Sequence, residues 1–113
     1  MAYCITEAQA GSDVSAIASH ASKTHDGWVL NDQKLWIHNA PIADIGLVLA
    51  KTDKEAGHRG MSIFIVDLHQ DGVTRGKKER KMGQRASQVE GLVLTKCTLL
   101  KMLYWVKKGV VFI

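Results

Sequence analysis

Short apolar segments separated by turn residues recur along most of this chain. Alternating or continuous apolar runs predict strands at residues 3–6, 17–23, 28–30, 33–37, 45–50, 61–66 and 89–94. Turn-forming residues interrupt these runs at Gly11-Ser12-Asp13, Asp26-Gly27, Asn31-Asp32 and Asp71-Gly72. No long segment keeps a helical period. The pattern therefore predicts an all-β domain, an antiparallel β-sandwich or barrel.

Three regions add detail to this expectation. The runs 28–30 and 33–37 flank Asn31-Asp32, a pair that tolerates positive φ, so a hairpin is expected there. Residues 53–60 are polar and contain two glycines, which predicts a loop. Residues 101–113 are strongly apolar and β-prone, broken only by lysines and a glycine. We therefore divide the chain into a β-domain at 1–100 and an atypical tail at 101–113.

Composition fits one small globular domain. The chain has 113 residues, of which 46% are hydrophobic and 23% charged. Its formal net charge of +4 is too weak to indicate a nucleic acid partner, and aromatic residues do not interleave with the basic ones. We see neither a signal-peptide pattern nor an apolar stretch long enough to span a bilayer. A cytoplasmic location without a membrane partner is therefore the expectation.

Cysteines and histidines give no metal pattern. Cys4 and Cys97 lie far apart, and two free buried thiols are the preferred reading, with a disulfide as the alternative. The remaining candidates lie singly in or near turns and are expected to be solvated: His20, His25, His58 and His69.

Four motifs, in this order, resemble the acyl-CoA dehydrogenase family. Residues 3–13 read Tyr-Cys-Ile-Thr-Glu-Ala-Gln-Ala-Gly-Ser-Asp, with Ala8 where the family usually has proline. Residues 30–37 read Leu-Asn-Asp-Gln-Lys-Leu-Trp-Ile, close to the family's Leu-Asn-Gly-x-Lys-x-Trp-Ile-Thr. Segments 50–53 with 60–66, and then 81–87, match the next elements. The resemblance covers residues 2 to 99 and points to the family's middle β-domain.

The resemblance implies a flavin site. Family members use FAD to form a trans-2,3 double bond in an acyl-CoA thioester: a glutamate removes the α-proton, and hydride leaves to flavin N5. By resemblance, Tyr3, Cys4 and Ile5 cover the flavin through backbone and van der Waals contacts. Thr6 would donate its hydroxyl to the pyrimidine edge of the flavin. The alternative for Thr6 is an ordinary β-branched strand residue.

The motif at residues 30–37 implies further contacts to the same flavin. Trp36 matches a tryptophan that packs along the isoalloxazine, and a core aromatic on a hairpin is the alternative, although both can hold. Ile37 and His38 complete this flavin-edge set. The family usually has Thr or Ser at the His38 position, with its hydroxyl near flavin N5. Imidazole can also donate there; the other reading is a solvent-facing His38 at the end of the hairpin.

Two further groups are assigned by resemblance. Ser12 would hydrogen-bond the acyl-CoA substrate, whereas Asp13 is equally well read as part of an ordinary turn. A basic cluster is expected to form a solvated loop face, with contact to CoA phosphates or to a neighbouring domain as the alternative. It comprises Arg75, Lys77, Lys78, Arg80, Lys81 and Arg85, with Glu79 among them.

The family's catalytic glutamate lies in a later α-helical domain. None of Glu7, Glu55, Glu79 and Glu90 matches it, so no catalytic residue is nominated and the chain alone is expected to be inactive. The full-length enzyme would pass electrons to an electron-transfer flavoprotein. Apolar faces left uncovered would favour association, such as a homo-oligomer.

The tail suggests a hypothesis about the reading frame. Plausible codons for residues 101–112, read in another frame, encode Asp-Ala-Leu-Leu-Gly-Glu-Glu-Gly-Arg-Gly-Phe, which is typical of the family at this point. We therefore expect a frameshift after residue 100; a genuine terminal strand is the alternative. The alternative function is a free-standing β-sandwich that binds a protein partner or acyl-CoA without redox chemistry.

Overall fold

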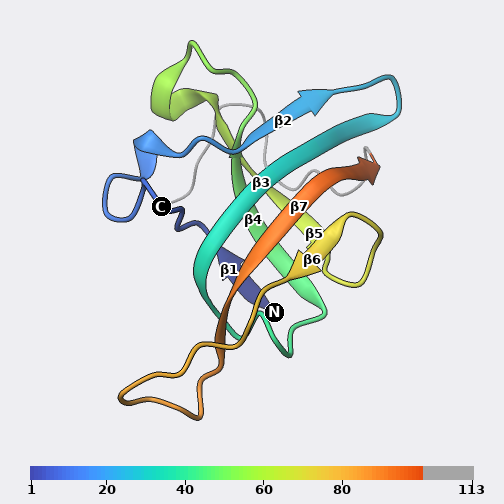
Figure 1. Ribbon diagram of the computed structural model, residues 1–113. Coiled ribbons are helices and arrows are strands. Elements are labelled where there is room, and N and C mark those ends of the chain that lie inside the picture. Colours follow the sequence, from blue (N-terminus) through green and yellow to red (C-terminus); the bar gives the residue numbers. More distant parts are fainter. Residues whose placement is uncertain (101–113) are drawn as a thin grey trace.

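The computed structural model describes residues 1–100, which form strands and short 3-10 helices (Figure 1). The elements are β1 (Ala2–Cys4), η1 (Val14–Ala16), β2 (His20–Lys23), β3 (Gly27–His38), β4 (Ile45–Lys51), η2 (Gly57–Gly60), β5 (Met61–Asp67), β6 (Val73–Arg75) and β7 (Val89–Leu100). The all-β prediction is confirmed for this part of the chain. No helix within it has the length and hydropathy needed to cross a membrane. The predicted tail, 101–113, lies outside the described residues.

All seven strands belong to one curled sheet that forms a half-barrel (Figure 1). β3 lies between β2 and β7, and β6 follows β7 at the edge, all in antiparallel pairs. β4 pairs antiparallel with β5 on one side. Along its other side β1 and then β2 run in the same direction as β4, so both pair with it in parallel. The sheet is therefore mixed: β1 and β2 pair with β4 in parallel, and the other strand pairs are antiparallel.

The hairpin predicted around Asn31-Asp32 is wrong. Both residues lie inside the continuous strand β3, and the hairpin joins β2 to β3, where Thr24 N–H donates to Gly27 O at 2.9 Å. Opposite Asn31 the neighbouring strand β7 bulges, and Lys96 takes a φ of 49°. Asn31 Oδ1 accepts a hydrogen bond from Lys96 N–H at 3.0 Å. The asparagine thus supports an irregularity in the adjacent strand rather than a turn in its own.

Other boundaries also shift. The predicted strand 17–23 begins only at His20, because η1 and a buried Ile17 precede it. β7 extends beyond the predicted 89–94, and β6 was not predicted from the sequence. Both depend on pairing with a neighbour, which a local pattern does not reveal.

Apolar side chains pack on both faces of β4 and β5. The main cluster fills the inside of the curl and includes Leu30, Phe64 and Leu92, with Trp28 edge-on to Phe64 at 5.8 Å between ring centroids. A second cluster on the outer face joins Leu49 and Ile63 to residues of the 5–17 segment. The long connection from β1 to β2 is thereby held against the sheet.

Both cysteines are free and buried in the main cluster, as predicted. Burial raises the pKa of the Cys4 thiol to about 12 and that of Cys97 above its ordinary value. These thiols therefore behave as small apolar side chains at neutral pH.

Candidate functional site

A bulge in β3 turns the Trp36 side chain out of the barrel. Inward positions alternate along β3 at Leu30, Asp32 and Lys34, and the same alternation would bury Trp36. In the pairing with β7, however, Lys34 lies opposite Leu92 and Ile37 opposite Glu90, so β3 carries one extra residue. As a result Ile37 is buried and Trp36 is 60% exposed. A bulge commonly re-aims a side chain in this way.

The backbone at Trp36 is strained. Its φ is 58°, in the left-handed region that bulky side chains rarely adopt, and Asn39 has a φ of 62°. Such conformations cost on the order of 1–3 kcal/mol and gather at functional sites. Two of them flank Ile37-His38, which marks this end of β3 as a candidate site.

The residues after β1 lie against the same bulge. Leu35 N–H donates to Thr6 O at 2.9 Å, which places Thr6 directly beside the residue that precedes Trp36. Thr6 and Ile5 are half-buried, and Tyr3 is 54% exposed. The structure therefore brings the two halves of the predicted flavin edge together, although they are about thirty residues apart in the sequence.

Two residues of the predicted flavin edge face the core instead. The side chains of Cys4 and Ile37 are buried in the main cluster. Only their main-chain atoms are available to a ligand.

His38 is exposed at the end of β3 and has a specific partner. Its Nδ1 lies 2.8 Å from Ser87 Oγ, and the direction of this hydrogen bond depends on the imidazole tautomer. The contact ties the candidate site to the loop between β6 and β7.

A buried ion pair fixes the segment that follows Thr6. Lys34 Nζ is fully buried and donates to Glu7 Oε1 at 2.8 Å, Ser19 Oγ at 2.9 Å and Leu49 O at 2.8 Å. Glu7 also accepts from Ala18 N–H at 2.7 Å and from the Ser19 hydroxyl. Burial alone would raise the pKa of Glu7, but the hydrogen bonds from Lys34, Ser19 and Ala18 outweigh it and lower that pKa to about 2.

Asp32 is the unsatisfied member of this group. Its Oδ2 lies 3.4 Å from Lys34 Nζ, yet neither carboxylate oxygen accepts a hydrogen bond from the described residues. Burial raises the pKa of Asp32 to about 6, and the neighbouring Lys34 ammonium only partly offsets this. The sequence analysis missed these charged residues as a unit, and the available signal was their place at inward positions of β3 beside Leu30.

Ser12 lies in an exposed loop that leads into η1. There Asp13 Oδ1 accepts from Ser15 N–H at 3.1 Å, an ordinary capping interaction, whereas Ser12 makes no hydrogen bond to the part of the chain that the structure describes. The Glu7 contacts to Ala18 and Ser19 close this loop onto the sheet. Ser12 thus remains separate from the Thr6–Trp36 edge in its immediate contacts.

The edge suits a planar heteroaromatic group. Trp36 offers an exposed aromatic surface, and the Thr6 hydroxyl has no hydrogen-bond partner within residues 1–100. Of the nearby carboxylates, Glu7 is held by Lys34, whereas Glu90 lies opposite Ile37 in β7 and is buried, with its Oε1 making no hydrogen bond to the described residues. Within the same residues no three His, Cys, Asp or Glu side chains gather as metal ligands. The arrangement can bind and orient such a group.

An all-β half-barrel with an exposed, strained tryptophan at one end is the class of domain that this fold and site define. The family model described as "Acyl-CoA dehydrogenase, middle domain" matches residues 2–97. The chain belongs to this family.

Individual relatives agree with this membership. The chain is 40% identical over 99 residues to the mitochondrial short-chain specific acyl-CoA dehydrogenase of Sus scrofa, covering 88% of this chain and 24% of that protein. It is 45% identical over 83 residues to the caffeyl-CoA reductase-Etf complex subunit CarC of Acetobacterium woodii, covering 74% of this chain and 22% of the relative. The structure of butyryl-CoA dehydrogenase from Megasphaera elsdenii matches with a TM-score of 0.92 and 38% identity, covering 96% of this chain and 28% of that one. The chain thus spans about a quarter of the length of the proteins it matches.

Proposed function

We propose that this chain supplies the β-domain side of an FAD site in an acyl-CoA dehydrogenase-type oxidoreductase. The observation that carries the proposal is the bulge that holds Trp36 outward beside Thr6. When bound, FAD would supply the hydride acceptor. The chain's own residues bind and orient: Trp36 packs along the ring, and Thr6 donates to its polar edge.

The names of the relatives support a proposal for the substrate class and the redox partner. The names of those relatives include an acyl-CoA dehydrogenase and a CoA-ester reductase that belongs to an Etf complex. We therefore propose an acyl-CoA thioester as substrate and an electron-transfer flavoprotein as redox partner. We propose that the proton-abstracting carboxylate comes from outside this chain, because Glu7 is paired with Lys34 and Glu90 is buried in the sheet opposite Ile37.

Flavin titration tests this proposal. The purified chain is titrated with FAD while flavin fluorescence and tryptophan quenching are followed. Trp36→Ala is expected to weaken FAD binding by about tenfold or more, the equivalent of about 1.4 kcal/mol. Thr6→Val should weaken it less, since it removes one hydrogen bond. Val93→Ala serves as control, because Val93 is 38% exposed on β7 and forms no part of the edge.

The proposal is overturned by equal affinities of the Trp36→Ala and Val93→Ala variants for FAD, or by CoA binding without any flavin binding. The second result supports a non-redox binding module instead. The same preparation, supplied with FAD and an acyl-CoA, is expected to reduce no artificial electron acceptor. Turnover by the chain alone would contradict the external base.

A further inference from the structure

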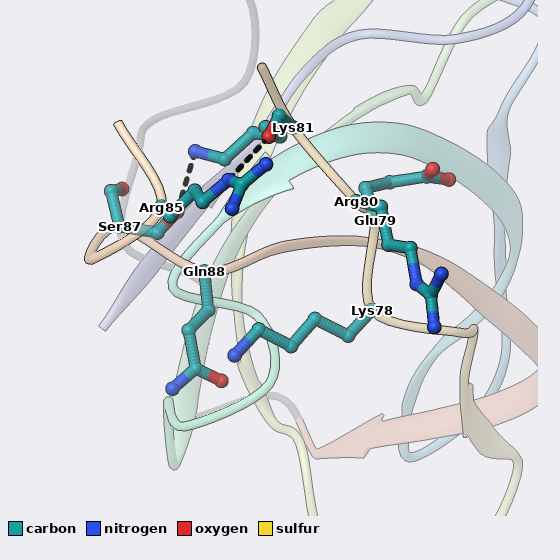
Figure 2. Close-up of a pocket in the computed structure, with 7 residues that line it drawn as sticks. All are labelled: Lys78, Glu79, Arg80, Lys81, Arg85, Ser87 and Gln88. Carbon is teal, nitrogen blue, oxygen red and sulfur yellow. Dashed lines mark hydrogen bonds between the residues drawn. The ribbon is translucent and has the colours of Figure 1, made fainter. Parts of the chain in front are cut away.

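The loop between β6 and β7 carries a pocket lined only by charged and polar side chains. In Figure 1 this loop, gold to orange, extends away from the sheet. The pocket has a volume of about 380 Å³. Its cations are Lys78, Arg80, Lys81 and Arg85, and Ser87 and Gln88 add neutral hydrogen-bonding groups. The one carboxylate in the lining, Glu79, is directed away from most of these side chains in Figure 2.

The loop is held in place by two of its own cations. Lys81 Nζ donates to Gln84 O at 2.7 Å and to Ser87 O at 2.6 Å. Arg85 Nε donates to Lys81 O at 2.8 Å, and Ser87 N–H to Gln84 O at 3.1 Å. Two of these contacts are drawn in Figure 2. The pocket wall is therefore ordered before any ligand arrives, which reduces the entropy lost on binding.

The other cationic groups of the pocket are left without partners. Lys78 and Arg80 form no ion pair or hydrogen bond through their side chains within residues 1–100, and only Nε of the Arg85 guanidinium is engaged. Glu79 forms no ion pair with any of them in that same range. Unused N–H donors therefore line the cavity. In Figure 2 the Lys78 side chain extends toward Gln88, whereas the Arg80 guanidinium extends to the other side.

We propose that this pocket binds the phosphate groups of a small organic polyphosphate, a nucleoside diphosphate in size. Guanidinium forks match phosphate oxygens in pairs, and lysine adds a mobile charge. The cavity volume lies in the range of small-ligand sites, and the absence of any apolar lining residue disfavours a hydrophobic ligand. Since Ser87 also bonds to His38, the site adjoins the end of β3 without depending on flavin.

Binding of phosphate compounds to the purified chain tests the inference. Calorimetric titrations with inorganic pyrophosphate, ADP and adenosine 3′,5′-bisphosphate are compared at low and moderate salt. Lys78→Gln/Arg80→Gln removes the two unengaged cations without touching the loop's internal hydrogen bonds. Lys23→Gln/Arg59→Gln makes the same change of charge at exposed positions elsewhere. Circular dichroism establishes that both variants fold.

The pocket variant is expected to bind pyrophosphate and ADP at least about tenfold more weakly, while the control changes less than about twofold, and affinity should fall with salt. ADP binding more tightly than pyrophosphate identifies a nucleotide site; equal affinities identify a site for the phosphates alone, and both support the proposal. Equal losses in the two variants would show diffuse attraction and overturn it. So would a chain that binds a polyglutamate peptide but neither pyrophosphate nor ADP.

Discussion

At the scale of single residues, the ammonium group of Lys34 is the cation that neutralises two carboxylates buried in the half-barrel. It lies within hydrogen-bond reach of the Glu7 carboxylate, and the Asp32 carboxylate is slightly farther away. All three side chains are buried. A buried charge is tolerated only when it is paired, so both carboxylates depend on the Lys34 ammonium.

Replacing the lysine should expose this dependence. Lys34→Met leaves Glu7 buried without its main partner and is expected to reduce the free energy of unfolding by about 3–5 kcal/mol. Urea denaturation measures the change. The double variant Glu7→Gln/Lys34→Met should lose less, because the glutamate charge is removed together with the lysine and only Asp32 is left without its cation. A loss below about 1 kcal/mol in the single variant, as for a surface pair, would contradict the buried pairing.

Asp32 predicts an unusual dependence of stability on pH. Its pKa is raised from 3.8 to about 6 by burial, so its contribution to stability is full below 3.8 and is lost as pH rises through 6. Glu7 acts in the opposite sense: its pKa is lowered from 4.5 to about 2, so its contribution is present above 4.5 and is lost as pH falls through 2. Together they place the maximum for this group in mildly acidic solution.

The Asp32→Asn variant separates these contributions. It is expected to be more stable than the parent chain at pH 7 and to lose that advantage near pH 4. The loss of stability at still lower pH, which comes from protonation of Glu7, should remain in both proteins. Denaturation midpoints across this pH range provide the measurement. Parallel pH profiles of stability for the two proteins would show that folding does not change the pKa of Asp32.

At the scale of elements, the connection from β4 to β5 leaves no room for a side chain at Gly60. Gly60 O accepts from both Thr52 N–H at 2.7 Å and Asp53 N–H at 3.0 Å. A methyl group on Gly60 would meet Asp53 O at 2.0 Å, and the obstructing atom belongs to the backbone.

Gly60→Ala is therefore expected to destabilise the chain by about 1–3 kcal/mol, since the β4–β5 connection must shift. Thermal or urea unfolding gives the value. Gly83→Ala is the matched control, because its added carbon would have no neighbour within 4 Å. Equal stability of the two variants would mean that the turn adjusts without cost.

Element type could be predicted from local patterns, whereas pairing could not. The apolar runs that became β4 and β5 are long and bounded by polar residues, so their alternation and length sufficed. The turn predicted at Asn31-Asp32 was wrong. An asparagine side chain can stabilise a turn in its own strand, but here it hydrogen-bonds to the bulge in the neighbouring strand. The site was predictable only through motif resemblance; the bulge that exposes Trp36 depends on its register with β7.

At the scale of the whole molecule, one strip of the outer surface is left apolar. Tyr3 lies opposite Leu47, and Leu47 opposite Ile65, so these side chains share a face with Ile45 two residues away. Tyr3 is 54% and Ile45 45% exposed. Contiguous apolar patches of this kind favour association.

The purified chain is accordingly expected to self-associate with rising concentration. Ile45→Lys should shift sedimentation coefficients toward the monomer, because it places a charge at an exposed position of the strip. Val93→Lys is the control: it introduces the same charge at an exposed position of β7 outside the strip and should leave association unchanged. A chain that sediments as a monomer at every concentration would rule out this surface as an interface.

The two irregularities in the β3–β7 pair compensate each other. β7 carries an extra residue near Lys96 and β3 carries one near Trp36, so the pairs at both ends, Gly27 with Leu100 and His38 with Val89, keep a common register. Losing a residue at one bulge would turn every side chain beyond it to the opposite face. Deleting one residue at either bulge alone should therefore prevent folding. Deleting one residue at each bulge should preserve the register at both ends of the strand pair, but it would return the Trp36 side chain to the interior.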